Sequence, residues 1–430
     1  MRRDVPPWLP GLSWYHLHAL RASGAADVNP DVSASQPSGH ALRLILDRLD
    51  HVAALGCGGI LLTPVTVSST HGYDTVDPFR IDQRLGDDDD FDALVAGCRA
   101  RGLRLVLDGV LNHVGRAFPR FVDVLERRNA SSSVDWFCID WDAAGHGDDG
   151  FGYRDFEGHP ELVALNHHSS EVLDWAADVC LHWLQRGADG WRFDVAYALP
   201  RPFLADVSRR VLGAHHDAFL FGEMIHGDYA GFVAESGLHS VTQYELHKAC
   251  WSACNDRNLF ELAWALRRHA EMATTFVPVT FGGNHDVTRL ASRLEDRRHL
   301  EVVLTALFVL PGTVCVYYGD EWGALGEKSD GAGGDDAIRP RLDDLRRDVD
   351  LEDVHRRLIA FRRDRPWLTD GVLEIGAVAN ERLEVVVTGE SGRRSIAATL
   401  DLTGAERPSP PATAVGWAAV DGLRGVWERA

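Results

Sequence analysis

Gly187-Ala-Asp-Gly-Trp-Arg-Phe-Asp194 is a turn followed by a short apolar strand that ends in a charged pair. Arg192 and Asp194 are two positions apart, so on a strand their side chains project from the same face. A neighbouring guanidinium keeps a carboxylate ionised, and an ionised aspartate at the end of a strand is suited to act as a nucleophile. For this segment alone, a buried Arg–Asp pair that only holds a loop is an equal alternative.

Similar apolar runs recur on both sides of this strand and alternate with segments of helical spacing. The runs cover residues 12–20, 59–65, 103–110, 190–194, 219–223, 240–244, 277–282 and 313–318. Helices are predicted at 41–55, 91–101 and 170–184, the first two with a glycine directly after them. Continuous apolar strands that alternate with helices indicate parallel βαβ units. Eight of them predict the α/β fold class and a (β/α)₈ barrel, a TIM barrel.

Two regions depart from this alternation and predict the domain organisation. The first, from about 114 to 166, is rich in Gly, Asp, His and aromatic residues, and after about 367 short alternating runs indicate antiparallel strands. We therefore divide the chain into 1–113, the first part of the barrel; 114–166, a small excursion after strand three; 167–366, the second part of the barrel; and 367–430, a C-terminal antiparallel β domain.

Charge and cysteine content limit the function classes. The 430 residues have a formal net charge of −20 and show no basic stripe, which argues against nucleic-acid and anionic-membrane partners and favours a neutral substrate. We expect no signal peptide and no membrane span. The seven cysteines are scattered without a C-x-x-C pair, so we expect free thiols and a cytoplasmic location. The oligomeric state stays open.

Polar side chains follow the predicted strands where function collects in such a barrel, at the carboxyl ends. They are Tyr73 and Asp74 after strand two, Asp108, Asn112 and His113 after strand three, Arg192 and Asp194 after strand four, Glu223 after strand five, and Asn284, His285 and Asp286 after strand seven. Three carboxylates from three strands would meet at one mouth. Structural ion pairs are not usually distributed in this way, so a functional site is favoured.

Four segments resemble the signature regions of the α-amylase family, glycoside hydrolase family thirteen. These are Asp108-Gly-Val-Leu-Asn-His113, Gly190-Trp-Arg-Phe-Asp194, Gly222-Glu223 and Asn284-His-Asp286, and they occur in the family's order. His71 to Asp74, Leu165-Asn166 and Gly312 to Gly319 also match. The resemblance covers nearly the whole chain and is closest to oligosaccharide-acting intracellular members such as neopullulanase, cyclomaltodextrinase and α-glucosidase.

The resemblance implies retaining chemistry on α-glucosides. Asp194 matches the family's nucleophile, Glu223 its acid/base and Asp286 its third carboxylate. Such a nucleophile and acid lie about 5–5.5 Å apart. Glu223 must then be protonated near neutral pH, while Arg192 is expected to hold the pKa of Asp194 low.

Three further residues match the family's substrate-binding positions: His113 and His285 as hydrogen-bonding histidines and Tyr73 as the stacking aromatic. Singly, His113 could instead be a satisfied histidine at a strand end, and Tyr73 a loop aromatic packed on a tryptophan. Asp108 is expected to be structural and to pair with Arg192 or a neighbour.

Substrate choice is only partly indicated. Val195 follows the predicted nucleophile, as in family members that accept α-1,6 links or cyclomaltodextrins, and Met-Ile-His226 after Glu223 is similar to the neopullulanase pattern. Short maltooligosaccharides are therefore the expected substrates. Hydrolysis and glucosyl transfer stay open, because both use the same covalent intermediate. The excursion is expected either to stack sugar rings through Trp136, Trp141, Phe151 or Tyr153, or to use these aromatics as a small core.

Two other function classes were weighed. His16-Leu-His18 on the first strand resembles the His-x-His metal ligands of barrel amidohydrolases, although strands four and five end in Arg192, Asp194 and Glu223. The second is a non-catalytic amylase-like scaffold that binds carbohydrate, and known scaffolds of this kind have lost the carboxylates that this chain keeps.

No metal is assigned, with calcium as an alternative. Asn112 matches a calcium position of the family. Asp27 to Asp31 has oxygen ligands at alternate positions, but the glycine of a calcium loop is missing at Val32. The Asp87–Asp90 run precedes a helix, where acidic side chains complement the macrodipole, and is given no chemistry.

Overall fold

The computed structural model describes residues 2–34, 36–143, 145, 149–331, 333–389, 391–405 and 408–429. Within these residues the central sheet has eight parallel strands: β1 (Ser13–Leu17), β2 (Gly59–Leu62), β5 (Arg104–Gly109), β11 (Gly190–Phe193), β12 (Phe219–Gly222), β13 (Ser240–Val241), β14 (Val279–Phe281) and β15 (Thr313–Tyr317). Their order is β13-β12-β11-β5-β2-β1-β15-β14, and a bridge between Thr242 and Val279 joins the two ends. The predicted barrel is confirmed.

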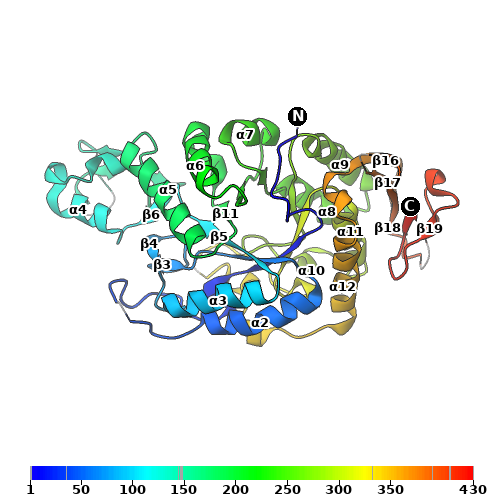
Figure 1. The fold of residues 1–430 in the computed structure, drawn as a ribbon, viewed down its shortest axis with the longest axis horizontal. Coiled ribbons are helices and arrows are strands. Elements are labelled where there is room, and N and C mark those ends of the chain that lie inside the picture. The colour runs from blue at the N-terminus through cyan, green and yellow to red at the C-terminus, as the bar shows by residue number, and fades with distance from the viewer. Residues whose placement is uncertain are drawn as a thin grey trace.

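Helices cover the outside of the sheet (Figure 1). They are α1 (Ala19–Ala22), α2 (Leu42–Leu55), α3 (Asp88–Ala100), α5 (Ser170–Gln185), α6 (Arg201–Ala214), α7 (Tyr229–Ser236), α8 (Tyr244–Asn255), α9 (Leu259–Ala273), α10 (Leu290–Arg293), α11 (His299–Val309) and α12 (Val349–Arg363). The three predicted helices are all present. Gly56 ends α2 in the left-handed conformation, with φ 97°, which a residue without Cβ adopts at little cost.

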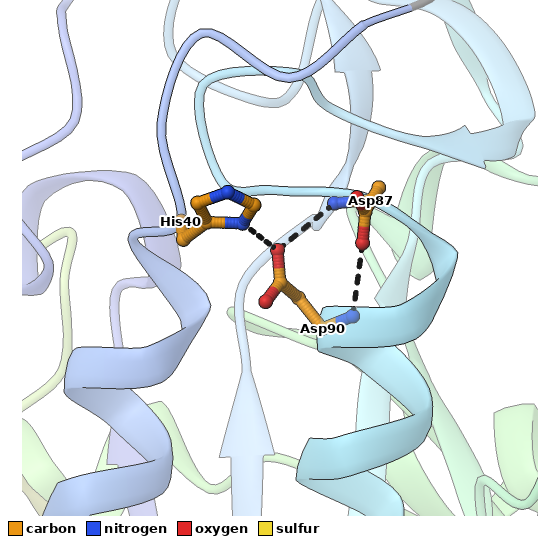
Figure 2. A group of neighbouring side chains, drawn as sticks. All are labelled: His40, Asp87 and Asp90. Carbon is orange, nitrogen blue, oxygen red and sulfur yellow. Dashed lines mark hydrogen bonds and ion pairs between the residues drawn. The ribbon is translucent and has the colours of Figure 1, made fainter.

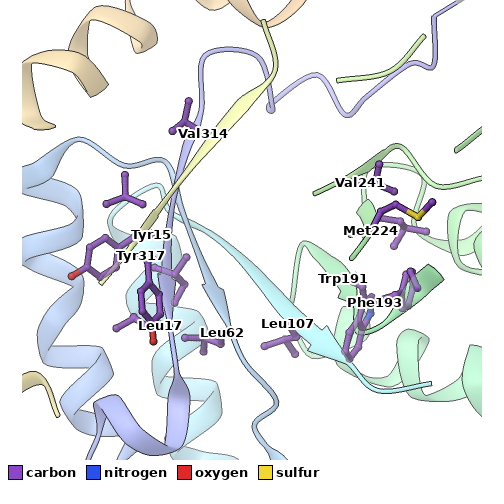
Figure 3. Packing of buried hydrophobic residues seen from close by; sticks show 14 of the residues in the cluster. Tyr15, Leu17, Leu62, Leu107, Trp191, Phe193, Met224, Val241, Val314 and Tyr317 are labelled. Atoms are coloured by element: carbon purple, nitrogen blue, oxygen red, sulfur yellow. The ribbon is translucent and has the colours of Figure 1, made fainter. Parts of the chain in front are cut away.

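Side chains alternate between the barrel interior and the layer under the helices. Leu62, Leu107, Trp191 and other outward residues belong to the large apolar cluster drawn in Figure 3. The interior is filled by a second cluster: Trp14, Leu61, Val106, Phe219, Phe221, Val279, Phe281 and Cys315 are among its members. This alternation follows from the two-residue period of a strand. It also fixes Arg192, between Trp191 and Phe193, on the inward face.

The excursion after β5 has its own small core. It contains the antiparallel sheet of β6 (His113–Gly115), β10 (His159–Ala164) and β9 (Asp155–Phe156), the pair β7 (Ile139–Asp140) and β8 (Gly152–Tyr153), and helix α4 (Pro119–Arg127). Trp136, Phe151 and Tyr153 are buried, and Trp141 packs on Phe151 with ring centroids 4.9 Å apart. Of the two alternatives for these aromatics, the structure favours the small core, because Trp136 packs on Phe118 and Trp175 while Phe151 packs on Trp141 and Tyr153.

The C-terminal segment forms an antiparallel sheet, as predicted. Its strands are β16 (Val372–Ala379), β17 (Arg382–Thr388), β18 (Ser395–Asp401), β19 (Ala418–Ala419) and β20 (Val426–Arg429), in the order β16-β17-β18-β20-β19. The turn between β16 and β17 contacts the start of α9, where the Leu259 N–H donates to the Asn380 carbonyl at 2.9 Å and Arg257 pairs with Glu381. The sheet and the excursion lie at opposite ends of the molecule (Figure 1).

The division of the chain at residues 113, 166 and 366 remains a prediction. None of the helices in the described ranges is long and apolar enough to cross a membrane.

Candidate active site

One arginine at the carboxyl end of the barrel contacts three carboxylates. Arg192 on β11 lies in register with Asp108 on β5, and its Nη1 donates to Asp108 Oδ2 at 2.5 Å. Nη1 lies 3.4 Å from Asp194 Oδ1, and Nη2 lies 2.9 Å from Glu223 Oε1. All four side chains are buried. Since β11 and β12 are adjacent strands, the residues after them, Asp194 and Glu223, are brought to the same guanidinium.

Glu223 receives the most donors at this mouth. Besides Arg192, the Tyr244 hydroxyl donates to its Oε1 at 2.9 Å, and the Val195 N–H donates to its Oε2 at 3.0 Å. Val195 has φ 40° and ψ 42°, a left-handed conformation that is unfavourable for a β-branched residue. This conformation turns the amide that directly follows Asp194 towards Glu223, so the backbone links the two carboxylates.

A second group lies at the same mouth, on the side of β14 and of the turn between β3 (Thr66–Ser68) and β4 (Thr75–Ile81), two antiparallel strands that follow β2. Tyr73 Oη lies 2.6 Å from His285 Nε2, which lies 3.0 Å from Asp286 Oδ2. Arg339, from the loop after β15, donates to the other Asp286 oxygen at 2.9 Å. The Tyr73 hydroxyl also contacts Asp108 Oδ2 at 3.1 Å and thereby connects the two groups.

The two groups differ in their electrostatics. Burial, together with the charge of Glu223, raises the pKa of Asp194 well above its ordinary value, although Arg192 acts in the other direction. Burial also disfavours the charge of Asp286, but His285, Arg339 and Arg192 together hold its pKa well below the ordinary value. The expectation that Arg192 would keep the pKa of Asp194 low is therefore wrong. The guanidinium lies closer to Asp108 and Glu223 than to Asp194.

His113 is buried at the start of β6 and lies against the excursion. Its ring stacks on Phe156 of β9 with centroids 4.9 Å apart, and its Nδ1 lies 3.2 Å from the Asn112 side-chain amide. Burial lowers the pKa of His113 to about 3, so the ring is neutral at physiological pH. A neutral imidazole offers a sugar hydroxyl either a donor or an acceptor.

The two histidines of the first strand pack around His285. The His16 and His18 rings lie 5.1 and 5.9 Å from the His285 ring, both edge-on, while Tyr73 stacks parallel to it at 5.5 Å. Burial lowers the pKa of His16 and of His18 well below the ordinary value. Within the described ranges these histidines belong to no group of three or more His, Cys, Asp or Glu side chains that could hold a metal ion.

The described residues do contain one such group, formed by His40, Asp87 and Asp90 (Figure 2). Asp87 and Asp90 form a capping box at the start of α3, and the Asp90 carboxylate also contacts His40 Nδ1 at 2.5 Å and Arg43 Nε at 2.8 Å. An arginine already neutralises the buried carboxylate, so these residues do not fit a cation. The structural interpretation of this acidic run is confirmed.

The calcium alternative in the loop from Asp27 to Asp31 meets a similar obstacle. Arg84 Nη1 donates to the carbonyl oxygens of Ala26 and Asp27 at 3.1 and 3.2 Å. The Asn29 side chain is engaged by Gln83 and donates to the Ser68 carbonyl at 3.0 Å. Oxygens that calcium would need are thus bound by protein donors.

Three residues of the mouth were not identified from the sequence. Tyr244 is the last residue of the predicted sixth strand and begins α8 in the structure, so extending the search for polar strand ends to that strand could have found it. Arg339 and Phe156 gave no comparable signal, because they lie in a loop and in the irregular excursion. Both residues are far from the carboxylates in the sequence and come to the same mouth only in the folded protein.

Comparison with known proteins agrees with this geometry. Residues 33–369 match the family described as alpha amylase, catalytic domain. The chain is 30% identical to a cyclomaltodextrinase of Geobacillus thermopakistaniensis over 95% of its length and 72% of the relative's, and 30% identical to the intracellular maltogenic amylase of Bacillus subtilis over 86% of its length and 65% of the relative's.

A solved structure similar to this chain is the ligand-free cyclic alpha-maltosyl-(1→6)-maltose hydrolase of Arthrobacter globiformis. The TM-score is 0.83 at 29% identity, with 98% of this chain and 99% of that chain covered. The family match covers every strand of the barrel but β1, and it includes Arg192 and the three carboxylates that Arg192 contacts. The chain belongs to the α-amylase family of glycoside hydrolases.

Proposed function

We propose that this protein is a retaining hydrolase of short α-linked glucose oligosaccharides that works through a covalent glycosyl-enzyme. The observation that supports it best is the placement of Asp194 and Glu223 on one guanidinium at the ends of adjacent strands. Double displacement requires two carboxyl groups on either side of the cleaved bond, and contact with a common guanidinium is consistent with that arrangement. Glycosyl transfer to a second sugar follows from the same intermediate when a sugar hydroxyl replaces water.

In the proposed reaction, Asp194 attacks the anomeric carbon while Glu223 protonates the departing oxygen. Water, deprotonated by Glu223, then attacks the same carbon and releases Asp194. The raised pKa of Asp194 means that its carboxyl group holds a proton more readily before the reaction than an ordinary aspartate does. We propose that the substrate oxygen, by accepting a hydrogen bond from Glu223, selects the state in which Glu223 holds the proton and Asp194 is ionised.

The second group binds the sugar whose bond is cleaved. Asp286 is kept ionised by Arg339 and His285, so it accepts hydrogen bonds from sugar hydroxyls throughout the reaction. His285 and His113 are proposed to bind further hydroxyls, and Tyr73 to stack on the sugar ring. Arg192 orients the catalytic carboxylates.

The proposed substrates are short linear or cyclic oligosaccharides with α-1,4 and α-1,6 links. The curated relatives are named for action on cyclomaltodextrins or as maltogenic amylases, and the structural neighbour for a cyclic α-1,6-linked maltose dimer. A neutral ligand is consistent with the net charge of −20. An intracellular location is proposed because all seven cysteines, each in the described ranges, are unpaired.

The deciding measurement is the anomer of the first product, followed by NMR during hydrolysis of maltotriose and of a cyclic α-1,6-linked tetrasaccharide. An α product supports retention, and a β product removes Asp194 from the nucleophile's position. Glu223→Gln is the second arm, since azide should restore turnover on substrates with a good leaving group and give the α-glycosyl azide. Oligosaccharide binding by the wild type with no turnover would favour the scaffold alternative.

A further inference from the structure

A groove of about 720 Å³ opens next to the catalytic carboxylates. It begins at Asp286 and Tyr244 and extends along α8 and α9, where Lys248, Trp251 and Trp264 line it. Its volume lies within the range of clefts that bind small molecules. Apart from Tyr244 and Asp286, the reaction proposed above uses none of the residues named here.

Trp264 is held in place on one side and open on the other. Its indole lies 5.2 Å from the Arg268 guanidinium. Arg268 is fixed in turn by two hydrogen bonds to Glu245, at 2.7 and 3.1 Å. Trp264 is nevertheless 58% exposed. A large apolar ring that is both fixed and exposed binds a partner ring without a large loss of side-chain entropy.

The groove lies on the side of Glu223. Tyr244, at its inner end, donates to Glu223 Oε1, and Ile225, two residues after Glu223, also lines the groove and is 40% exposed. In a retaining glycosidase the acid protonates the departing oxygen, so the leaving group lies on the acid's side. The same space later admits the molecule that attacks the glycosyl-enzyme.

We propose that this groove binds the leaving-group end of the oligosaccharide, with Trp264 stacking on a sugar ring beyond the cleaved bond. Ile225 provides apolar contact near the bond, and the Lys248–Glu261 ion pair provides a donor and an acceptor for hydroxyls. Trp264 is then a specificity-determining residue that favours long or cyclic leaving groups and sugar acceptors over water. The assignment rests on the proposed function and adds residues of α9 to it.

A second copy of the chain is the competing occupant of this surface. Phe260 lies four residues before Trp264 on the same face of α9 and is 52% exposed. It does not line the groove, however. A protein interface would use both aromatics, whereas a sugar bound in the groove uses only Trp264. Phe260→Ala is therefore a matched control on the same helix.

The test compares Trp264→Ala and Phe260→Ala with the wild type on two substrates, maltopentaose and p-nitrophenyl α-maltoside. For Trp264→Ala, kcat/KM on maltopentaose should fall about tenfold, while the value for the small leaving group should change less than about twofold. Trp264→Tyr should retain most of the activity on maltopentaose. Because Trp264 is largely exposed, circular dichroism and thermal melting should match the wild type.

Three outcomes would overturn the assignment: an equal loss on both substrates, no loss on either, or the same loss in Phe260→Ala. Sedimentation velocity tests the competing occupant, since a change of oligomeric state in both variants would identify a protein interface. If the wild type turns over neither substrate, the proposed function fails. Calorimetry with maltopentaose in the Glu223→Gln background then tests separately whether the groove binds the oligosaccharide. Weaker binding in Trp264→Ala but not in Phe260→Ala supports the assignment, and unchanged binding in Trp264→Ala rejects it.

Discussion

The two sides of the barrel mouth balance their charges in different ways. On the β5–β11–β12 side, Asp108, Asp194 and Glu223 share a single guanidinium from Arg192. On the β14 side, Arg339 pairs with both Asp286 and Asp335, and His285 also contacts Asp286. The first side has three buried carboxylates around one guanidinium, and the pKa of Asp194 is raised. On the second side His285, Arg339 and Arg192 outweigh the effect of burial, and the pKa of Asp286 is lowered.

In the proposed mechanism, the carboxylates on the β5–β11–β12 side gain and lose protons, whereas Asp286 on the β14 side keeps its charge. Carboxylates that compete for one cation change protonation when a substrate arrives, which is what the proposed acid and nucleophile must do. A carboxylate whose pKa is lowered stays ionised over a wide pH range. We therefore propose that the first side of the mouth moves protons during the reaction and that the second side binds sugar hydroxyls.

The largest expected effect is the loss of turnover in Asp194→Asn. The amide has nearly the same volume but cannot form the covalent intermediate, so kcat should fall about 10⁴-fold on maltotriose. Binding of maltotriose, measured by calorimetry, should persist because the β14 side is unchanged. If the variant keeps more than about a tenth of the wild-type activity, Asp194 is not the nucleophile.

A smaller effect is expected for Tyr244→Phe, which removes one donor to Glu223 and leaves Arg192 and the Val195 amide in place. A hydrogen bond to a charged group contributes about 1.5–3 kcal/mol, so kcat/KM should fall at least about tenfold. An unchanged kcat/KM would limit Tyr244 to packing.

The smallest effect tests the comparison most directly, since the same substitution should change stability in opposite directions on the two sides. The raised pKa of Asp194 means that the folded state loses stability as pH rises from about 4 through that raised pKa. Asp194→Asn removes this loss and should stabilise the protein by about 1 kcal/mol at pH 7. The gain should largely disappear at about pH 4, where the carboxyl is protonated in the folded state and about half protonated in the unfolded state.

Asp286→Asn should do the reverse. A lowered pKa contributes stability that is present above pH 4 and is lost as pH falls through the folded-state pKa. The variant should therefore be less stable at pH 7, by about 1 kcal/mol, since the side chain is 32% exposed and solvent screens part of the interaction. Urea unfolding at pH 7 and pH 4 measures both variants. Shifts of the same sign would show that the two sides do not differ in charge balance.

Most of the barrel was predictable because its signals are local. A buried parallel strand is a continuous apolar run, and the carboxyl end of each run marks the functional edge of the sheet. Asp194, Glu223 and Asp286 follow three such runs, and the structure brings all three to one mouth through Arg192, Asp108, Tyr73 and His285.

The parts that could not be predicted depend on which neighbours meet in space. The two-residue spacing of Arg192 and Asp194 correctly indicates a shared face, but the register with β5 places Asp108 nearer to the guanidinium. The aromatic content of the excursion does not distinguish a sugar-binding wall from a core, and Phe121 and Phe137 complete the core. The fixed, exposed position of Trp264 depends on Arg268 and Glu245, a pair formed between two helices.

The contact between α9 and the C-terminal sheet has an evolutionary consequence. The turn between β16 and β17 contacts α9 at Leu259 and, through Glu381, contacts Arg257 just before the helix, one helical turn or more from Trp264. A replacement of the C-terminal sheet would thus also change the contacts that support α9. If Trp264 binds the leaving group as proposed, a change in the C-terminal sheet alters acceptor choice without any change in the carboxylates of the barrel.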